Sequence, residues 1–97
     1  MTSQAETAPE GQAGFVGQIP PVEPLIAEVI STLSLAAHAY LTEAEGRNPD
    51  HASAEVAIDI ASAAFERVKE RLRSEERLAI TQMLTETRMT FVRKRGI

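Results

Sequence analysis

Residues 54–72 have the sequence AEVAIDIASAAFERVKERL, and the spacing of their apolar side chains decides the fold class. The apolar positions step by four and three residues along one helical seam, which consists of Ala54, Ile58, Ala61, Phe65, Val68 and Leu72. This spacing places the side chains on one face of an α-helix, because the helix turns once in 3.6 residues. The stretch predicts an amphipathic helix over about residues 50–72, with Asn48 or Asp50 as its N-cap.

A second helix is predicted before it, over about residues 24–45. Pro24 suits the first turn of a helix and Gly46 suits its C-terminal stop. Its seam consists of Ile26, Ile30, Leu33, Ala37, Tyr40 and Ala44. Further apolar residues lie outside that seam, so we expect this helix to be buried on nearly all sides.

A third helix is predicted over about residues 75–95, with Ser74 as its cap. One stripe suits the core, and it consists of Ile80, Met83, Leu84, Thr87 and Phe91. Leu78, Met89 and Val92 fall on nearly the opposite side of the same helix. Two helices cover only one side of a third, so we expect these three residues to form an interface.

The three helices predict an all-α fold, because no sustained period-two alternation indicates a strand. Both connections are short, and short connections favour antiparallel neighbours. We expect a three-helix antiparallel bundle, running up, down and up, in one domain over residues 23–97. A chain of 97 residues buries a limited core, so association with another surface would add stability.

Residues 1–22 are rich in Pro and Gly and predict a flexible N-terminal arm. Its bulky apolar residues are Phe15, Val16, Ile19 and Val22. One interpretation is a disordered leader with incidental hydrophobic residues. The other is an extended clip, stiffened by Pro20 and Pro21, that lies across a neighbouring surface.

The composition argues against catalysis and against a metal or cofactor. The chain has no cysteine, and its two histidines, His38 and His51, have no partner ligand at helical spacing. The sequence has no glycine-rich phosphate-binding loop, which would follow a strand, because no strand is predicted. We therefore expect no enzyme activity, no metal site and no cofactor, with His38 as a partly buried polar residue.

The charge distribution bears on nucleic-acid binding. Residues 1–46 hold six acids and no bases, and residues 47–97 hold eight acids and ten bases, giving net charges of −6 and +2. A domain that binds nucleic acid usually shows a stronger positive field. Nucleic-acid binding through Arg93, Lys94 and Arg95 is therefore the alternative and not the first interpretation.

The longest uncharged run in the helical part covers residues 29–42, fourteen residues. A membrane span needs about 20 apolar residues, so we expect a buried helix and no span. The lack of cysteine fits a reducing cytoplasm.

Several short motifs resemble a small bacterial protein family catalogued as domain of unknown function 1844. The family pattern is an apolar helix, a Gly/Asn-Pro turn, an Ala-x-x-x-Ile-Asp element, a turn with Glu-Glu, and an Arg-Met-x-aromatic-Val stretch. The matching segments here, within about residues 25–92, are residues 46–50, 54–59, 74–76 and 88–92. The resemblance implies a helical fold in a bacterial cytoplasm, and the family has no established activity.

Together these observations predict a non-catalytic protein–protein interaction module. It would act as a homodimer or higher oligomer, or as a small accessory subunit of a larger assembly. The interface residues would be Leu78, Met89 and Val92.

Overall fold

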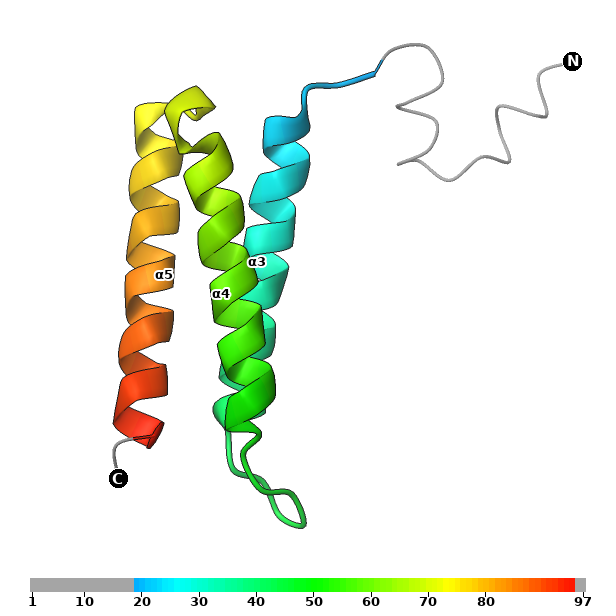
Figure 1. Cartoon of the computed structure of the whole chain (residues 1–97), viewed down its shortest axis with the longest axis vertical. Helices are drawn as coiled ribbons and strands as arrows, with labels where there is room; N and C mark the ends of the chain where they lie inside the picture. The colour runs from blue at the N-terminus through cyan, green and yellow to red at the C-terminus, as the bar shows by residue number, and fades with distance from the viewer. Residues whose placement is uncertain (1–18, 96–97) are drawn as a thin grey trace, which may run out of the picture.

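The computed structural model describes residues 19–95, which form three long helices. These are α3 (Val22–Leu41), α4 (His51–Val68) and α5 (Ser74–Arg95), with a short 3-10 helix, η1 (Lys69–Arg71), between the last two. The helices run antiparallel to their chain neighbours and lie side by side (Figure 1). No strand occurs among the described residues. The all-α three-helix bundle is therefore confirmed.

The core is centred on the predicted seam of α4. Every member of that seam is buried: Ala54, Ile58, Ala61, Phe65, Val68 and Leu72. From α5 the core receives Ile80, Leu84, Thr87 and Phe91, so the predicted core stripe is confirmed apart from the half-buried Met83. Alanines on α3 and α4 leave room for close approach of the two backbones, and these helices share the most extensive contact in the bundle.

The prediction that the first helix is buried on nearly all sides is wrong. Only four of the 20 residues of α3 are buried, namely Ile30, Ser34, Ala37 and Leu41. Leu25, Val29, Tyr40 and especially Leu35 remain exposed. The physical reason is that α4 and α5 together contact one side of α3, and no fourth helix among the described residues covers the rest.

Helix α3 also ends four residues earlier than expected, at Leu41. The Thr42 hydroxyl donates to the His38 carbonyl, and the Arg47 guanidinium donates to the carbonyls of Ala39 and Thr42. These bonds satisfy carbonyls of the last turn, which have no partner inside a helix. Gly46 lies in the following turn, with φ of 77°, and does not stop the helix.

The remaining helix ends differ from the sequence expectations by a few residues. Helix α3 begins at Val22, two residues before Pro24, so Val22 belongs to the helix and not to the arm. Asp50 caps α4, because its carboxylate accepts hydrogen bonds from the backbone N–H and the hydroxyl of Ser53. Ser74 is the first residue of α5 and not its cap.

The start of α5 is fixed by Glu76 instead. Its carboxylate accepts from the backbone N–H of Arg73 and from the Arg73 guanidinium. A glutamate in the first turn that reaches back to the backbone in this way satisfies a donor that the helix leaves free. Helix α4 ends at Val68, and η1 carries the chain over to α5.

Candidate interaction surfaces

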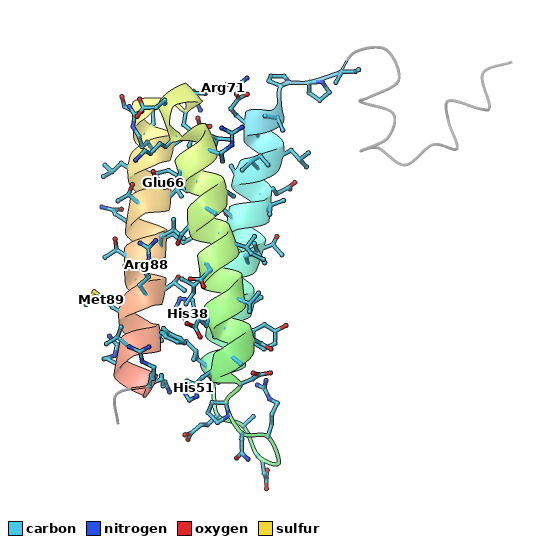
Figure 2. All side chains as sticks on the ribbon, viewed as in Figure 1. His38, His51, Glu66, Arg71, Arg88 and Met89 are labelled. Carbon is cyan, nitrogen blue, oxygen red and sulfur yellow. The ribbon has the colours of Figure 1, made fainter. Side chains whose placement is uncertain are left out.

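The outer face of α5 is the surface that the sequence singled out. Leu78, Met89 and Val92 are 59%, 55% and 54% exposed, on the side of α5 that faces away from the other helices. Met89 projects from the outer edge of the bundle in Figure 2. The exposure of these three side chains agrees with the sequence analysis.

Two uncharged residues connect the apolar ones along this face. Gln82 and Thr85 are exposed, and with Leu78, Met89 and Val92 they step by four, three, four and three residues. That spacing is the heptad pattern of a helix–helix seam. We call these five residues the α5 stripe.

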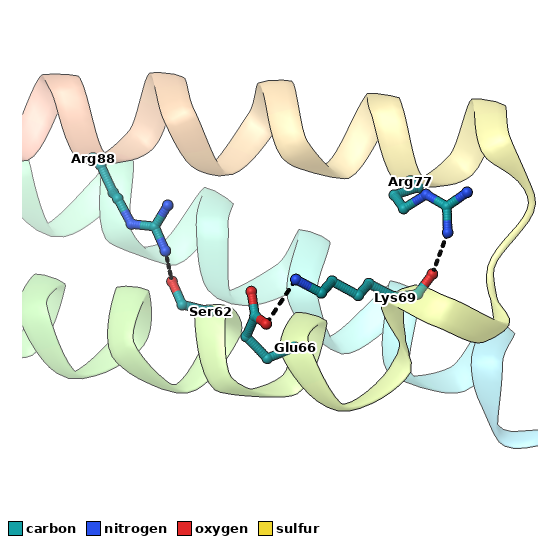
Figure 3. Close-up of polar contacts among 5 residues, drawn as sticks. All are labelled: Ser62, Glu66, Lys69, Arg77 and Arg88. Carbon is teal, nitrogen blue, oxygen red and sulfur yellow. Dashed lines mark hydrogen bonds and ion pairs between the residues drawn. The ribbon is translucent and has the colours of Figure 1, made fainter.

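Three arginines border the α5 stripe, and each points toward another group. The Arg88 guanidinium donates to the Ser62 hydroxyl of α4 (Figure 3). The Arg93 guanidinium donates to the Thr90 hydroxyl at 3.3 Å, and Arg95 lies over the Phe91 ring, 5.2 Å from its centroid. The stripe itself contains no charged residue, and the guanidinium groups beside it have partners outside it.

A second apolar surface is a groove between α3 and α4, with a volume of about 360 Å³. Val56 and Ile60 on its α4 wall are 56% and 52% exposed. The whole lining is uncharged: Leu33, Ala36, Tyr40, Ala52, Ser53, Val56, Ala57 and Ile60. We call this surface the α3–α4 groove.

The sequence analysis missed this groove, although a signal existed. Val56 and Ile60 are large apolar residues outside the α4 seam, and Tyr40 was assigned to the core seam of the first helix. Helical spacing shows that such residues share a side, but it does not show which neighbouring helix leaves that side uncovered.

A polar contact lies between α3 and α5. His38 Nε2 is 3.2 Å from the hydroxyl of Thr87, which is fully buried and donates to the Met83 carbonyl. A depression of about 380 Å³ borders this contact and includes Ser34 and Glu86. Within residues 19–95, no three His, Asp or Glu side chains gather as metal ligands would.

Charged side chains mostly form local pairs near the η1 end of the bundle. Lys69 contacts Glu66 at 2.8 Å, and this hydrogen bond raises the pKa of Lys69 (Figure 3). Arg71 of η1 pairs with Glu23 of α3, whose side chain is largely covered. These pairs bring opposite charges together and leave little uncompensated positive charge at this end.

The residues predicted as a tail clip are described only in part. Ile19 lies before α3 and Val22 is the first residue of α3, and both side chains are exposed. Phe15 and Val16 lie outside the described residues.

Helix α3 is long and apolar enough to cross a membrane, judged by its length and composition alone. The sequence analysis considered only the uncharged run of residues 29–42, whereas α3 also includes the apolar residues before it. In the bundle 22% of this apolar window is buried, and both mostly buried core helices and signal sequences pass the same test.

Comparison with known proteins finds no matching family model, no matching curated protein and no matching solved structure. The resemblance to the bacterial family therefore stays a prediction.

Proposed function

We propose that this chain is a non-catalytic protein–protein interaction module, acting as a homo-oligomer or as an accessory subunit of a larger assembly. The observation that carries the proposal is the presence of two uncharged surfaces with exposed large apolar side chains, the α5 stripe and the α3–α4 groove, on so small a bundle.

Single exposed hydrophobic residues are common on protein surfaces. Here, however, large apolar residues recur along one face of α5 and along both walls of the groove. Fully burying one such side chain is worth about 1.5–3 kcal/mol, so a complementary surface gains several favourable contacts at once. The groove is the more contiguous of the two surfaces, since the polar Gln82 and Thr85 separate Leu78 from Met89 on α5. Contiguous apolar surface is typical of interaction sites.

The alternative function is nucleic-acid binding by the last turn of α5, which contains Arg93, Lys94 and Arg95. It is the weaker candidate, because the chain is acidic overall and two of these three cations contact groups of their own helix. Binding through phosphate contacts would weaken steeply with added salt. A salt titration with generic RNA and DNA distinguishes this alternative, since the preferred function predicts no such binding.

The proposed function is tested by sedimentation velocity of the full chain over a wide concentration range. Leu78→Glu/Met89→Glu disrupts the α5 stripe and Val56→Glu/Ile60→Glu disrupts the groove. Leu35→Glu is the matched control, because Leu35 is 71% exposed and belongs to neither surface.

We expect the wild-type chain to assemble. At least one of the two double variants should dissociate this assembly, and Leu35→Glu should leave it intact. Circular dichroism should show unchanged helix content in all variants. The proposal fails if the wild-type chain is monomeric at every concentration and the tagged chain brings down no stoichiometric partner from its host cells.

A further inference from the structure

The two ends of the α5 stripe are bordered by opposite charges. Glu75 and Glu76 stand in the first turn of α5, and Arg93, Lys94 and Arg95 stand in its last turn. The stripe itself, between them, is uncharged and exposed. A second α5 helix on this face would meet Glu75 and Arg93 near the ends of the stripe, and Glu86 and Arg88 beside its centre. Which of these charges come together depends on the direction of the second helix.

The spacing of the apolar residues fits an antiparallel partner. If a two-fold axis passes between Met83 and Leu84, Leu78 of one copy lies opposite Met89 of the second copy. The same axis places Gln82 opposite Thr85 of the second copy. Large apolar side chains then meet on both sides of the axis and polar ones meet at its centre, as in an antiparallel helix pair with a heptad seam. At each end of the contact Val92 lies opposite Glu75 of the second copy.

The charges near the ends of the stripe favour the same direction. In the antiparallel arrangement Glu75 of one copy lies near Arg93 of the second copy, and the two-fold axis repeats this attraction. The two helix dipoles also point in opposite directions in this arrangement, which brings the positive end of one helix near the negative end of the other. In a parallel arrangement Glu75 would face the same residue of the second copy, and Arg88 would face Arg93 across the seam, so like charges would meet.

We infer that a second copy of this chain occupies the α5 stripe, with the two α5 helices antiparallel about a two-fold axis. This inference rests on the proposed function and names its partner. The α3–α4 groove gives no comparable indication of an occupant, because its lining carries no charge to orient one.

Engineered disulfides test the direction directly, because the natural chain has no cysteine. Full-length Leu78→Cys and Met89→Cys, distinguished by an affinity tag on one of them, are mixed and oxidised. We expect the mixed 78–89 disulfide to form several-fold faster than either symmetric disulfide.

The reason is distance. In the antiparallel register two copies of residue 78 are separated by about 16 Å along the helices at 1.5 Å per residue, and a disulfide needs Cα atoms within about 7 Å. Leu35→Cys, on a different face, gives the background rate. Symmetric disulfides that form faster than the mixed one would overturn the inference in favour of a parallel pair.

Charge reversal provides an independent test. Glu75→Arg and Arg93→Glu should each raise the dissociation constant of the dimer about tenfold, because each converts two symmetric attractions into repulsions. Combining both substitutions in one chain should restore the wild-type constant. In a parallel pair, combining the two substitutions would not restore the affinity of the dimer, and that result would overturn the inference.

Failure of the inference is distinguishable from failure of the proposed function. If Val56→Glu/Ile60→Glu dissociates the dimer and Leu78→Glu/Met89→Glu does not, the α5 pairing is wrong while the interaction function stands. The same holds if the chain is monomeric alone and forms a stoichiometric complex with a different protein. Retained helical circular dichroism shows that each variant is still folded.

Discussion

The imidazole Nε2 of His38 lies 3.2 Å from the Thr87 hydroxyl oxygen, and this contact joins α3 to α5 across 49 residues of sequence. The Thr87 hydroxyl donates its hydrogen to the Met83 carbonyl at 2.8 Å. A threonine hydroxyl has one hydrogen, so His38 must donate from Nε2 to the Thr87 oxygen. The contact therefore requires a proton on Nε2 and fixes how α5 lies against α3.

Replacing Thr87 with Val tests this contact, because valine keeps the shape and removes the hydroxyl. We expect the free energy of unfolding to fall by about 1 kcal/mol or somewhat more, since His38 loses its acceptor in a partly buried place. Urea denaturation at neutral pH measures the change. Thr81→Val, at an exposed position of the same helix, is the control. Equal stability of the two variants would show that the contact contributes nothing.

The core of α4 could be predicted from sequence because charged residues lie outside its apolar seam and so indicate the side that faces away from the core. Glu55 and Asp59 lie outside the seam, and each seam residue is buried, although Val56 and Ile60 extend the apolar surface of α4 beyond the seam. The exposure of the α5 stripe was predictable for a related reason. A bundle of three helices can cover only one side of α5, and the apolar residues of α5 fall on two sides.

The surroundings of α3 could not be predicted in this way. Apolar residues occur nearly all round α3, so their pattern does not indicate the direction of the core. The end of α3 was also missed, because it depends on Arg47, whose side chain reaches back to Ala39 from beyond the turn. The α3–α4 groove follows from the first of these points, since it consists of apolar surface on α3 and α4 that no residue of α5 lines.

Leu84 and Leu35 offer a matched comparison of the two kinds of apolar position. Leu84 is buried between the helices, and Leu35 is mostly exposed. Leu84→Ala should lower the free energy of unfolding by about 2–5 kcal/mol, because it removes buried contacts and leaves a cavity. Leu35→Ala should change it by less than about 0.5 kcal/mol. Chemical denaturation measures both changes. A comparable loss of unfolding free energy in the two variants would contradict the described packing.

Two carboxylates at helix starts make stability depend on acid pH. The hydrogen bond from the Ser53 backbone N–H lowers the pKa of Asp50 below its ordinary value of 3.8. The hydrogen bond from the Arg73 side chain lowers the pKa of Glu76 below 4.5. The unfolded chain therefore binds protons more readily than the folded one, and the stabilisation, fully present above these ordinary values, is lost as pH falls through the folded values.

The double variant Asp50→Asn/Glu76→Gln isolates this effect. Asparagine still caps a helix and glutamine can still accept a hydrogen bond, but neither titrates. We expect the melting temperature of the variant to fall less steeply than that of the wild-type chain as pH drops below about 4.5. Thermal melts followed by circular dichroism at several pH values measure this. Parallel curves would show that these two carboxylates do not govern the acid response.

Substitution of Leu35 with Arg tests whether α3 packs in the bundle or spans a membrane. In the bundle, Leu35 points mainly into water, so arginine should change the free energy of unfolding by less than about 0.5 kcal/mol. In a spanning helix the same position is the fourteenth of the 20 residues of Val22–Leu41, within the apolar span, where arginine costs up to about 2.5–3.5 kcal/mol of insertion free energy. We expect the wild-type chain to stay unbound in flotation with phosphatidylcholine vesicles and the variant to match it in stability. If the wild-type chain instead floats with the vesicles and the Leu35→Arg variant does not, α3 leaves the bundle and enters the bilayer.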